Sequence, residues 1–154
     1  MNQAKLRALL EEVSRGSLDP QAAEGQLLSA LRARPFEDLG FARVDHHRSI
    51  RNGFSEVVLG LGKTPAQIAA IAEEIVGRGS TLLVTRASQA AYEAVRQVVP
   101  AAAYYADAGI ITLRQKDVIP GKGHVLIVAA GTSDLPVAEE AARTAELMGN
   151  EIDR

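Results

Sequence analysis

The sequence contains no cysteine and no tryptophan. It therefore supplies no disulfide, no thiolate nucleophile and no cysteine-ligated zinc, and this composition is consistent with a reducing compartment. Aromatic residues make up only 4% of the chain, so aliphatic side chains must form most of the core. No apolar run approaches the roughly 20 residues of a membrane span, and the N-terminal residues lack the apolar stretch of a secretory signal. We expect a cytoplasmic protein that has no membrane partner.

The chain also lacks an excess of positive charge, because its formal net charge is -2. Without a broad positive field, binding to a nucleic-acid backbone is disfavoured, although a local basic cluster can still hold a small anion. The 47% of hydrophobic and 23% of charged residues are typical of a globular protein. A length of 154 residues fits one domain, or one small domain and part of another.

Apolar residues at helical spacing dominate the first part of the chain. Leu6, Leu9, Leu10 and Val13 predict one amphipathic helix, and Gly16 stands where a left-handed stop is expected. Asp19-Pro20 then provides an N-cap and a first-turn proline for a second helix that ends before Pro35. We expect a helical hairpin over residues 3–34.

Short apolar runs and helical stripes alternate over residues 40–114, which is typical of an α/β arrangement with largely parallel strands. Thr64, Pro65 and Gln67 predict a capping box at the start of a helix that ends near Gly77. A second helix is expected over 88–99. The expected strands cover residues 41–44, 57–59, 81–85, 102–105 and 110–113.

The break Pro120-Gly121-Lys122-Gly123 is the best predicted domain boundary. We assign residues 1–120 to an N-terminal α/β domain and 121–154 to the opening strand and helix of a second domain. A strand over 125–130 is followed by a turn at Gly131 and by a helix with Pro136 in its first turn. The last residues, 150–154, are interpreted as the polar end of this helix.

Basic residues in polar breaks beside the predicted strands are the first candidates for a site. Lys63 precedes a helix, and Arg86 follows the carboxyl end of a strand, where open α/β sheets build their sites. Arg48, with Arg43 and Arg51 beside it, can bind phosphate or carboxylate through its guanidinium group. The alternative for each residue is an ordinary solvated surface charge.

The turn Gly131-Thr132-Ser133-Asp134 is the second candidate site. Its free amides and the positive end of the following helix can hold a phosphate or carboxylate, while the simpler alternative is that Ser133 and Asp134 only cap the helix. His46 and His47 are adjacent and point in different directions, so we expect no metal site from them.

Several separated motifs resemble two related families. Thr132-Ser133-Asp134-Leu135-Pro136-Val137 is similar to the phosphate-binding and ribose-binding turn of the PurE aminoimidazole ribonucleotide (AIR) carboxylases, with Leu135 in place of a tryptophan. The upstream motifs resemble those of the LarB family of nickel-pincer cofactor biosynthesis proteins, in which an N-terminal domain precedes a PurE-like domain with a flavodoxin-like or Rossmann-like parallel sheet. These motifs are Asp45-His46-His47-Arg48, Arg51-Asn52-Gly53, Glu56-Val57-Val58, Gly62-Lys63-Thr64 and Thr85-Arg86-Ala87-Ser88.

The LarB resemblance implies an enzyme that carboxylates the pyridine ring of nicotinic acid adenine dinucleotide with CO2. It also hydrolyses the phosphoanhydride, giving pyridinium-3,5-biscarboxylic acid mononucleotide and AMP. The family uses a cysteine nucleophile, which this chain lacks.

We therefore expect the front portion of a longer protein, inactive alone and without a catalytic residue of its own. The resemblance further implies a homo-oligomer at full length, CO2 as co-substrate, no tightly bound cofactor and an undefined metal requirement. The alternatives are a PurE-type AIR carboxylase and a non-catalytic nucleotide-binding or interaction module.

Overall fold

The computed structural model describes the whole chain except residues 1–2, 33–35, 47, 49–52, 116 and 119. The chain forms two compact units, residues 1–56 and residues 57–154. This division lies upstream of the boundary that we predict between residues 120 and 121, which stays a prediction. None of the described helices is long and apolar enough to cross a lipid bilayer.

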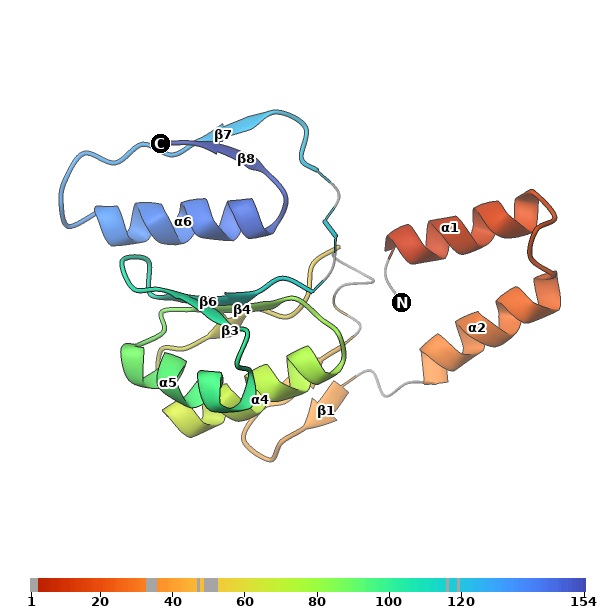
Figure 1. Ribbon diagram of the computed structural model, residues 1–154, viewed down its shortest axis with the longest axis horizontal. Helices are drawn as coiled ribbons and strands as arrows, with labels where there is room; N and C mark the ends of the chain where they lie inside the picture. Colours follow the sequence, from red (N-terminus) through yellow and green to blue (C-terminus); the bar gives the residue numbers. More distant parts are fainter. Residues whose placement is uncertain (1–2, 33–35, 47, 49–52, 116, 119) are drawn as a thin grey trace. The chain divides into compact units, whose positions relative to one another are not determined.

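The first unit begins with two helices, α1 (Gln3–Ser14) and α2 (Pro20–Arg32), which contact each other as the predicted hairpin (Figure 1). The apolar stripe of α1 places Leu9 in the small core of this unit, where it is 5% exposed. Asp19 caps α2 as predicted, because its Oδ2 accepts hydrogen bonds from the backbone amides of Gln21 and Ala22 at 3.0 and 3.2 Å.

A short hairpin follows, in which β1 (Phe36–Asp38) pairs antiparallel with β2 (Arg43–Asp45). Our prediction of a single strand over 41–44 overlaps only with β2. The turn starts at Asp38, whose Oδ1 accepts a hydrogen bond from the Gly40 amide at 2.8 Å, and Gly40 has a φ of 80°. The polar run 45–52 that follows is typical of a turn or a short helix, and it lies partly outside the described residues.

The second unit contains a four-stranded sheet and two helices that follow the predicted order. Its strands lie in the order β3-β4-β6-β5. The elements are β3 (Val58–Leu59), α4 (Pro65–Gly77), β4 (Leu82–Thr85), α5 (Gln89–Val98), β5 (Ala103–Tyr105) and β6 (Ile110–Leu113).

The expectation of largely parallel strands is wrong for this sheet. Only β3 and β4 are parallel, whereas β6 pairs antiparallel with both β4 and β5. A parallel pair needs a crossover of a dozen or more residues, usually with a helix, but only residues 106–109 join β5 to β6. The short connection therefore dictates a hairpin, and the α/β class is retained with a mixed sheet.

The last part of the second unit is a β-α-β arrangement in which β7 (His124–Leu126) pairs parallel with β8 (Glu151–Asp153) and α6 (Leu135–Leu147) connects them. The strand predicted over 125–130 is shorter than expected, so the predicted tight turn is a loop over residues 127–134. Residues 151–153 form a strand and not a helix end, because their side chains alternate and their backbone pairs with β7.

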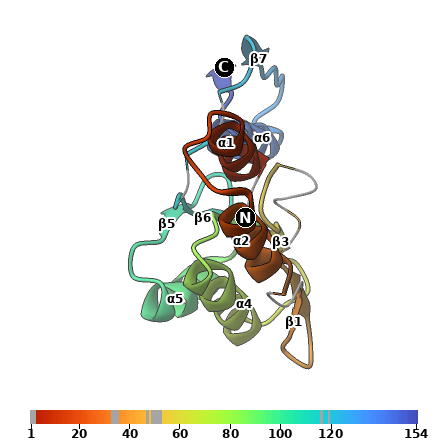
Figure 2. The same ribbon diagram turned by 90° about the vertical axis from the view of Figure 1, so that its right-hand side faces the viewer.

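Layers of helices cover both faces of the four-stranded sheet (Figure 1). Helices α4 and α5 pack side by side below it, and α6 lies above it; Figure 2 shows the same layers from the side. The most deeply buried large side chains lie in this unit: Ile68, Ile75, Leu82, Leu83, Val84, Val95, Ile110 and Ile111. The loops that carry the charged groups described below follow directly from the ends of these buried strands.

Candidate functional site

The carboxyl ends of the parallel strands β3 and β4 form one edge of the sheet. Because the strands are neighbours, the loops that lead into α4 and α5 both begin at this edge. Open α/β sheets bind ligands outside the carboxyl ends of their strands. Two predicted site residues, Lys63 and Arg86, belong to these loops.

The loop after β3 contacts the end of β4 through its backbone. The Gly60 amide donates a hydrogen bond to the Thr85 carbonyl at 2.7 Å. A Cβ at Gly60 would lie 2.8 Å from the Arg86 carbonyl oxygen, closer than real contacts allow. In the same loop, the Lys63 ammonium donates a hydrogen bond to the Leu59 carbonyl at 2.9 Å. Glycine at position 60 is therefore what allows the two loops to meet.

The loop after β4 is held in an uncommon backbone conformation. Arg86 has a φ of 52°, and it is the one residue other than glycine with a positive φ in the part of the chain that the structure describes. Ala87, the next residue, is held through both of its backbone polar groups, because its amide donates to the Gly109 carbonyl at 2.7 Å and its carbonyl accepts from the Tyr104 hydroxyl at 3.3 Å. Such conformations persist where the surroundings determine them, and they cluster at functional sites.

Both helices that start at this edge are capped by their own side chains. Thr64 and Gln67 form the predicted capping box on α4, with hydrogen bonds of 3.2 and 2.9 Å. On α5, the Ser88 hydroxyl accepts a hydrogen bond from the Ala91 amide at 3.2 Å. These caps satisfy part of the free amides, so the Lys63 and Arg86 side chains are the charged groups that this edge offers to an anion.

The Arg86 guanidinium has an internal partner on α6. Its Nε lies 3.0 Å from Oε2 of Glu140, and the two side chains are 49% and 19% exposed. The sequence did not indicate Glu140, because it looks like any solvated residue of an amphipathic helix. The contact was also not predictable from local spacing, since Arg86 and Glu140 are far apart in the chain.

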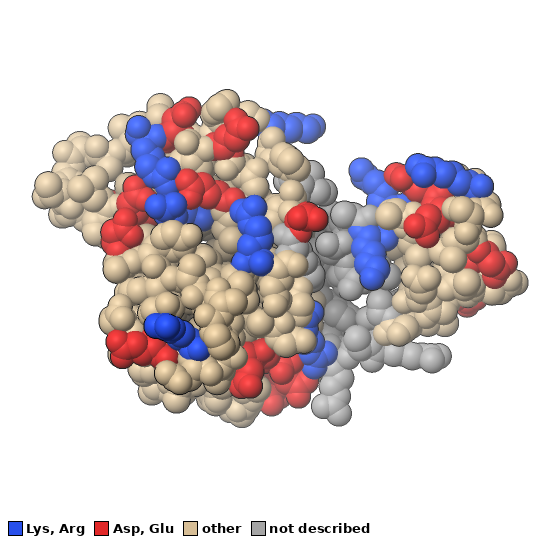
Figure 3. All heavy atoms as spheres, viewed as in Figure 1, with Lys and Arg blue, Asp and Glu red and all other residues tan. Residues whose placement is uncertain are grey.

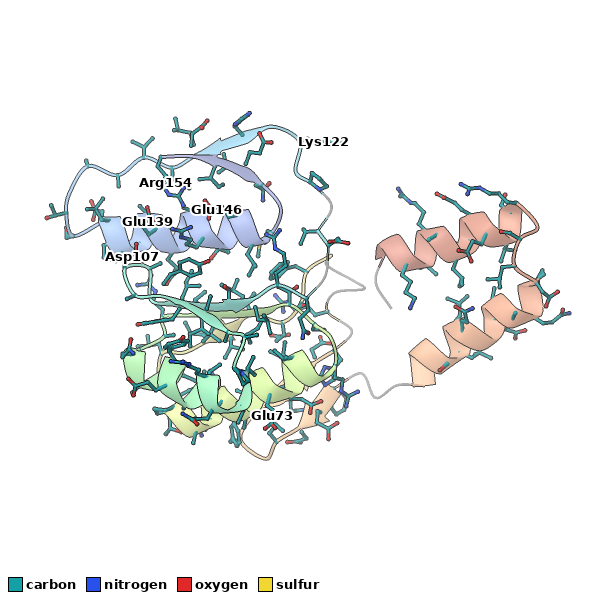
Figure 4. The ribbon with its side chains drawn as sticks, viewed as in Figure 1. Glu73, Asp107, Lys122, Glu139, Glu146 and Arg154 are labelled. Carbon is teal, nitrogen blue, oxygen red and sulfur yellow. The ribbon has the colours of Figure 1, made fainter. Side chains whose placement is uncertain are left out.

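The other acidic residues of α6 bind different arginines. Arg154 Nε lies 3.1 Å from Glu139 Oε1, and its Nη2 lies 2.8 Å from Glu146 Oε1; Figure 4 shows the three side chains together. The hydrogen bond with Glu146 raises the pKa of Arg154 above its ordinary value. Arg143 lies 3.2 Å from Glu146 and 4.5 Å above the Tyr105 ring. In Figure 3, basic and acidic side chains accordingly lie beside one another over α6.

The turn 131–134 does not have the predicted geometry. Asp134 is helical in its backbone and makes no side-chain capping bond, so the prediction that it caps α6 is wrong. Its amide instead donates to the Gly131 carbonyl at 3.0 Å. Thr132 and Ser133 are exposed, and Pro136 lies in the first turn of α6 as predicted.

The predicted site residues are only partly brought together. Lys63 and Arg86 share the sheet edge, and the loop 131–134 precedes the helix whose Glu140 contacts Arg86. Arg48 belongs to the first unit, where its Nη1 lies 3.8 Å from Glu56 Oε2. Arg43 lies 3.8 Å above the Phe36 ring. Arg51 and His47 lie outside the described residues.

A charged sheet edge that follows parallel strands, beside two capped helices, is typical of α/β proteins that bind small anionic molecules. Residues 36–116 match the family model for the LarB/PurE-like N-terminal domain, which covers more than half of the chain. The chain therefore belongs to the LarB-type PurE-like family. This confirms the resemblance inferred from the sequence motifs. A search of curated proteins finds no match to the chain.

Proposed function

We propose that the chain takes part in the biosynthesis of a nickel-pincer nucleotide cofactor. The reaction is the carboxylation of the pyridine ring of nicotinic acid adenine dinucleotide with CO2, with hydrolysis of the phosphoanhydride to give pyridinium-3,5-biscarboxylic acid mononucleotide and AMP. The observation that carries the proposal is the family match over residues 36–116, which includes both loops of the charged sheet edge. The membership itself supports only a PurE-superfamily protein, so substrate and reaction are our proposal.

The chemistry of this substrate suits the charged edge. The dinucleotide carries two phosphates and a nicotinate carboxylate, and Lys63 and Arg86 are cations at the ends of adjacent parallel strands. A guanidinium group binds such oxyanions through paired N–H donors. We assign Lys63 and Arg86 to these anionic groups. Arg48 and the loop 131–134 remain proposed further contacts.

This chain supplies binding and not the nucleophile. A cysteine that adds to the pyridinium ring is part of the proposed chemistry, and the sequence has none. In the proposal, CO2 is a co-substrate and the active form is a cytoplasmic homo-oligomer. The measurable role of these residues is therefore affinity for the substrate, and we expect no turnover of the dinucleotide by the purified chain.

The alternative is a PurE-type AIR carboxylase, because membership of a LarB/PurE-like family is compatible with either reaction. Its substrate, aminoimidazole ribonucleotide, carries one phosphate and no pyridine ring. The two ligands therefore test the two proposals directly.

Isothermal titration of the chain with each ligand distinguishes the proposals. We expect binding of nicotinic acid adenine dinucleotide, and a loss of about 10-fold or more in affinity for Lys63→Ala and for Arg86→Ala, as for a hydrogen bond to a charged group. Arg78→Ala is the matched control, because Arg78 pairs with Glu74 at the other end of α4. Binding of aminoimidazole ribonucleotide alone would favour the alternative. Equal affinities in all variants would refute the assigned site.

A further inference from the structure

The ion pair between Arg86 and Glu140 occupies the side chain that the proposed function assigns to the ligand. The Arg86 Nε lies 3.0 Å from Oε2 of Glu140, a distance at which a phosphate or carboxylate oxygen of a ligand would also pair with the guanidinium group. The Glu140 side chain is only 19% exposed, whereas Arg86 is 49% exposed. The carboxylate thus lies on the protein side of the guanidinium group, and part of Arg86 stays open to solvent.

The position of Arg86 does not depend on this pair. The backbone on either side of it is fixed by the Gly60–Thr85 and Ala87–Gly109 hydrogen bonds, both 2.7 Å long. The guanidinium group is therefore presented by a rigid loop, and only its partner needs to change when a ligand binds.

The position of α6 does not depend on this pair either. Arg114, which follows β6, donates through Nη2 to the carbonyl oxygens of Glu146 and Leu147 at 2.7 and 3.4 Å. These are the last carbonyls of α6, which carry the negative end of the helix dipole. Arg143 adds its contact with the Tyr105 ring. These contacts attach the helix to the sheet independently of Arg86.

Glu140 differs from Glu139 and Glu146, two other acidic residues of α6, in the location of its arginine partner. Glu139 and Glu146 both bind Arg154, and Glu146 also binds Arg143, so their ion pairs link α6 to the residue that follows β8 and to itself. The ion pair of Glu140 instead reaches the charged sheet edge. It is the carboxylate of this helix that a ligand at Arg86 would meet.

We propose that Glu140 is an internal competitor for the oxyanion site at Arg86, and that a phosphate or carboxylate group of the ligand displaces it. The ion pair is autoinhibitory, because it lowers the affinity of Arg86 for other anions until an oxyanion of the ligand replaces the Glu140 carboxylate. This inference rests on the proposed function, which places the ligand at Arg86.

The test is a titration of the chain with inorganic pyrophosphate and, separately, with nicotinate. Glu140→Gln removes the competing charge, and we expect about 2- to 5-fold tighter binding, as for a partly exposed ion pair. Glu146→Gln is the matched control, because it removes the same charge from the same helix without touching Arg86. The double variant Arg86→Ala/Glu140→Gln should lose the gain. The probe that gains affinity identifies phosphate or carboxylate as the group bound.

With these two probes, unchanged affinity for both in Glu140→Gln, or an equal gain in Glu146→Gln, would overturn the inference. Far-ultraviolet circular dichroism of each variant verifies that it is folded. The Nε–H resonance of Arg86 gives an independent measurement, which should shift on addition of the probe in the wild type toward its position in Glu140→Gln.

Titration with nicotinic acid adenine dinucleotide separates this inference from the proposed function. If pyrophosphate binds more tightly to Glu140→Gln while the dinucleotide binds to no variant, the proposed function fails and the internal competitor stands. If the dinucleotide binds the wild type and Glu140→Gln equally, the proposed function stands and the competitor fails.

Discussion

Arg86 has a backbone φ of 52°, which is uncommon for a residue other than glycine. The backbone hydrogen bonds of Thr85 and Ala87 on either side hold it in this conformation. For residues with a Cβ this conformation costs roughly 1–2 kcal/mol. Such conformations cluster at functional sites, so the backbone of Arg86 agrees with the role that we propose for its charge.

Two substitutions at position 86 separate the backbone from the side chain. Arg86→Gly and Arg86→Ala both remove the guanidinium group, but only glycine relieves the positive φ. We expect the free energy of unfolding of Arg86→Gly to exceed that of Arg86→Ala by about 1 kcal/mol. Urea denaturation followed by tyrosine fluorescence measures it, because Tyr92, Tyr104 and Tyr105 are the three tyrosines of the chain and all lie in the second unit. Equal stabilities would show that the conformation is not strained.

The close approach at Gly60 gives a second prediction. In Gly60→Ala the added Cβ meets backbone oxygens of Arg86 and Thr85 at 2.8 and 3.0 Å, so the two loops must move apart. We expect a loss of about 1–3 kcal/mol in unfolding free energy, as for overpacking of a dense core. Gly77→Ala is the control, because a Cβ there meets nothing within 4 Å. A Gly60→Ala variant as stable as this control would contradict the contact.

Helices α4 and α5, which begin at the sheet edge, differ from α6 in how their N-termini are capped. Thr64 and Ser88 lie in extended backbone and bind amides of the first turn, whereas Asp134 has helical backbone and no capping bond. We expect Thr64→Ala and Ser88→Ala each to lower the unfolding free energy by about 1 kcal/mol, and Asp134→Ala to change it by a few tenths at most. The same fluorescence titration compares them. An equal cost for Asp134→Ala would restore the predicted cap.

The helices and the caps at Asp19 and Thr64 were predictable because their signals are local, as in Thr64 with Gln67. The antiparallel pairing of β6 could not be predicted from its own residues, because apolar runs such as Ile110–Leu113 look the same in parallel and antiparallel sheets; the short connection at 106–109 was the available signal. At the site, Lys63 and Arg86 were found because they follow strands. Glu140 and Tyr104 were missed because only the tertiary fold brings them to Arg86 or Ala87.

For the whole molecule, the described core is unevenly divided between the two units. Among the described residues, all the large side chains that are less than 2% exposed lie in the second unit. The described apolar residues that are buried in the first unit are Leu9, Ala23 and Val44. Little apolar burial gives low local stability.

Hydrogen exchange measures this difference. We expect amides of α1 and α2 to exchange much faster than those of β4 and β6, whose strands are in the centre of the sheet. Mass spectrometry of exchanged peptides resolves both groups in one sample. Equal protection in the two units would contradict the uneven distribution of the core.

Helix α6 contacts two arginines, each of which follows a strand of the four-stranded sheet: Arg86 follows β4 and Arg114 follows β6. These two strands are antiparallel neighbours. Because antiparallel strands end at opposite edges of a sheet, the Arg86 and Arg114 contacts lie near opposite edges. Glu140 and Glu146 are separated by roughly 9 Å along a helix axis. The two contacts are thus independent: exchange of the Arg86 partner for an anion leaves the contact of Arg114 with the carbonyl oxygens at the end of α6 in place. The helix that connects β7 and β8 can therefore stay in place while the anion site at the other end of the strands exchanges its partner.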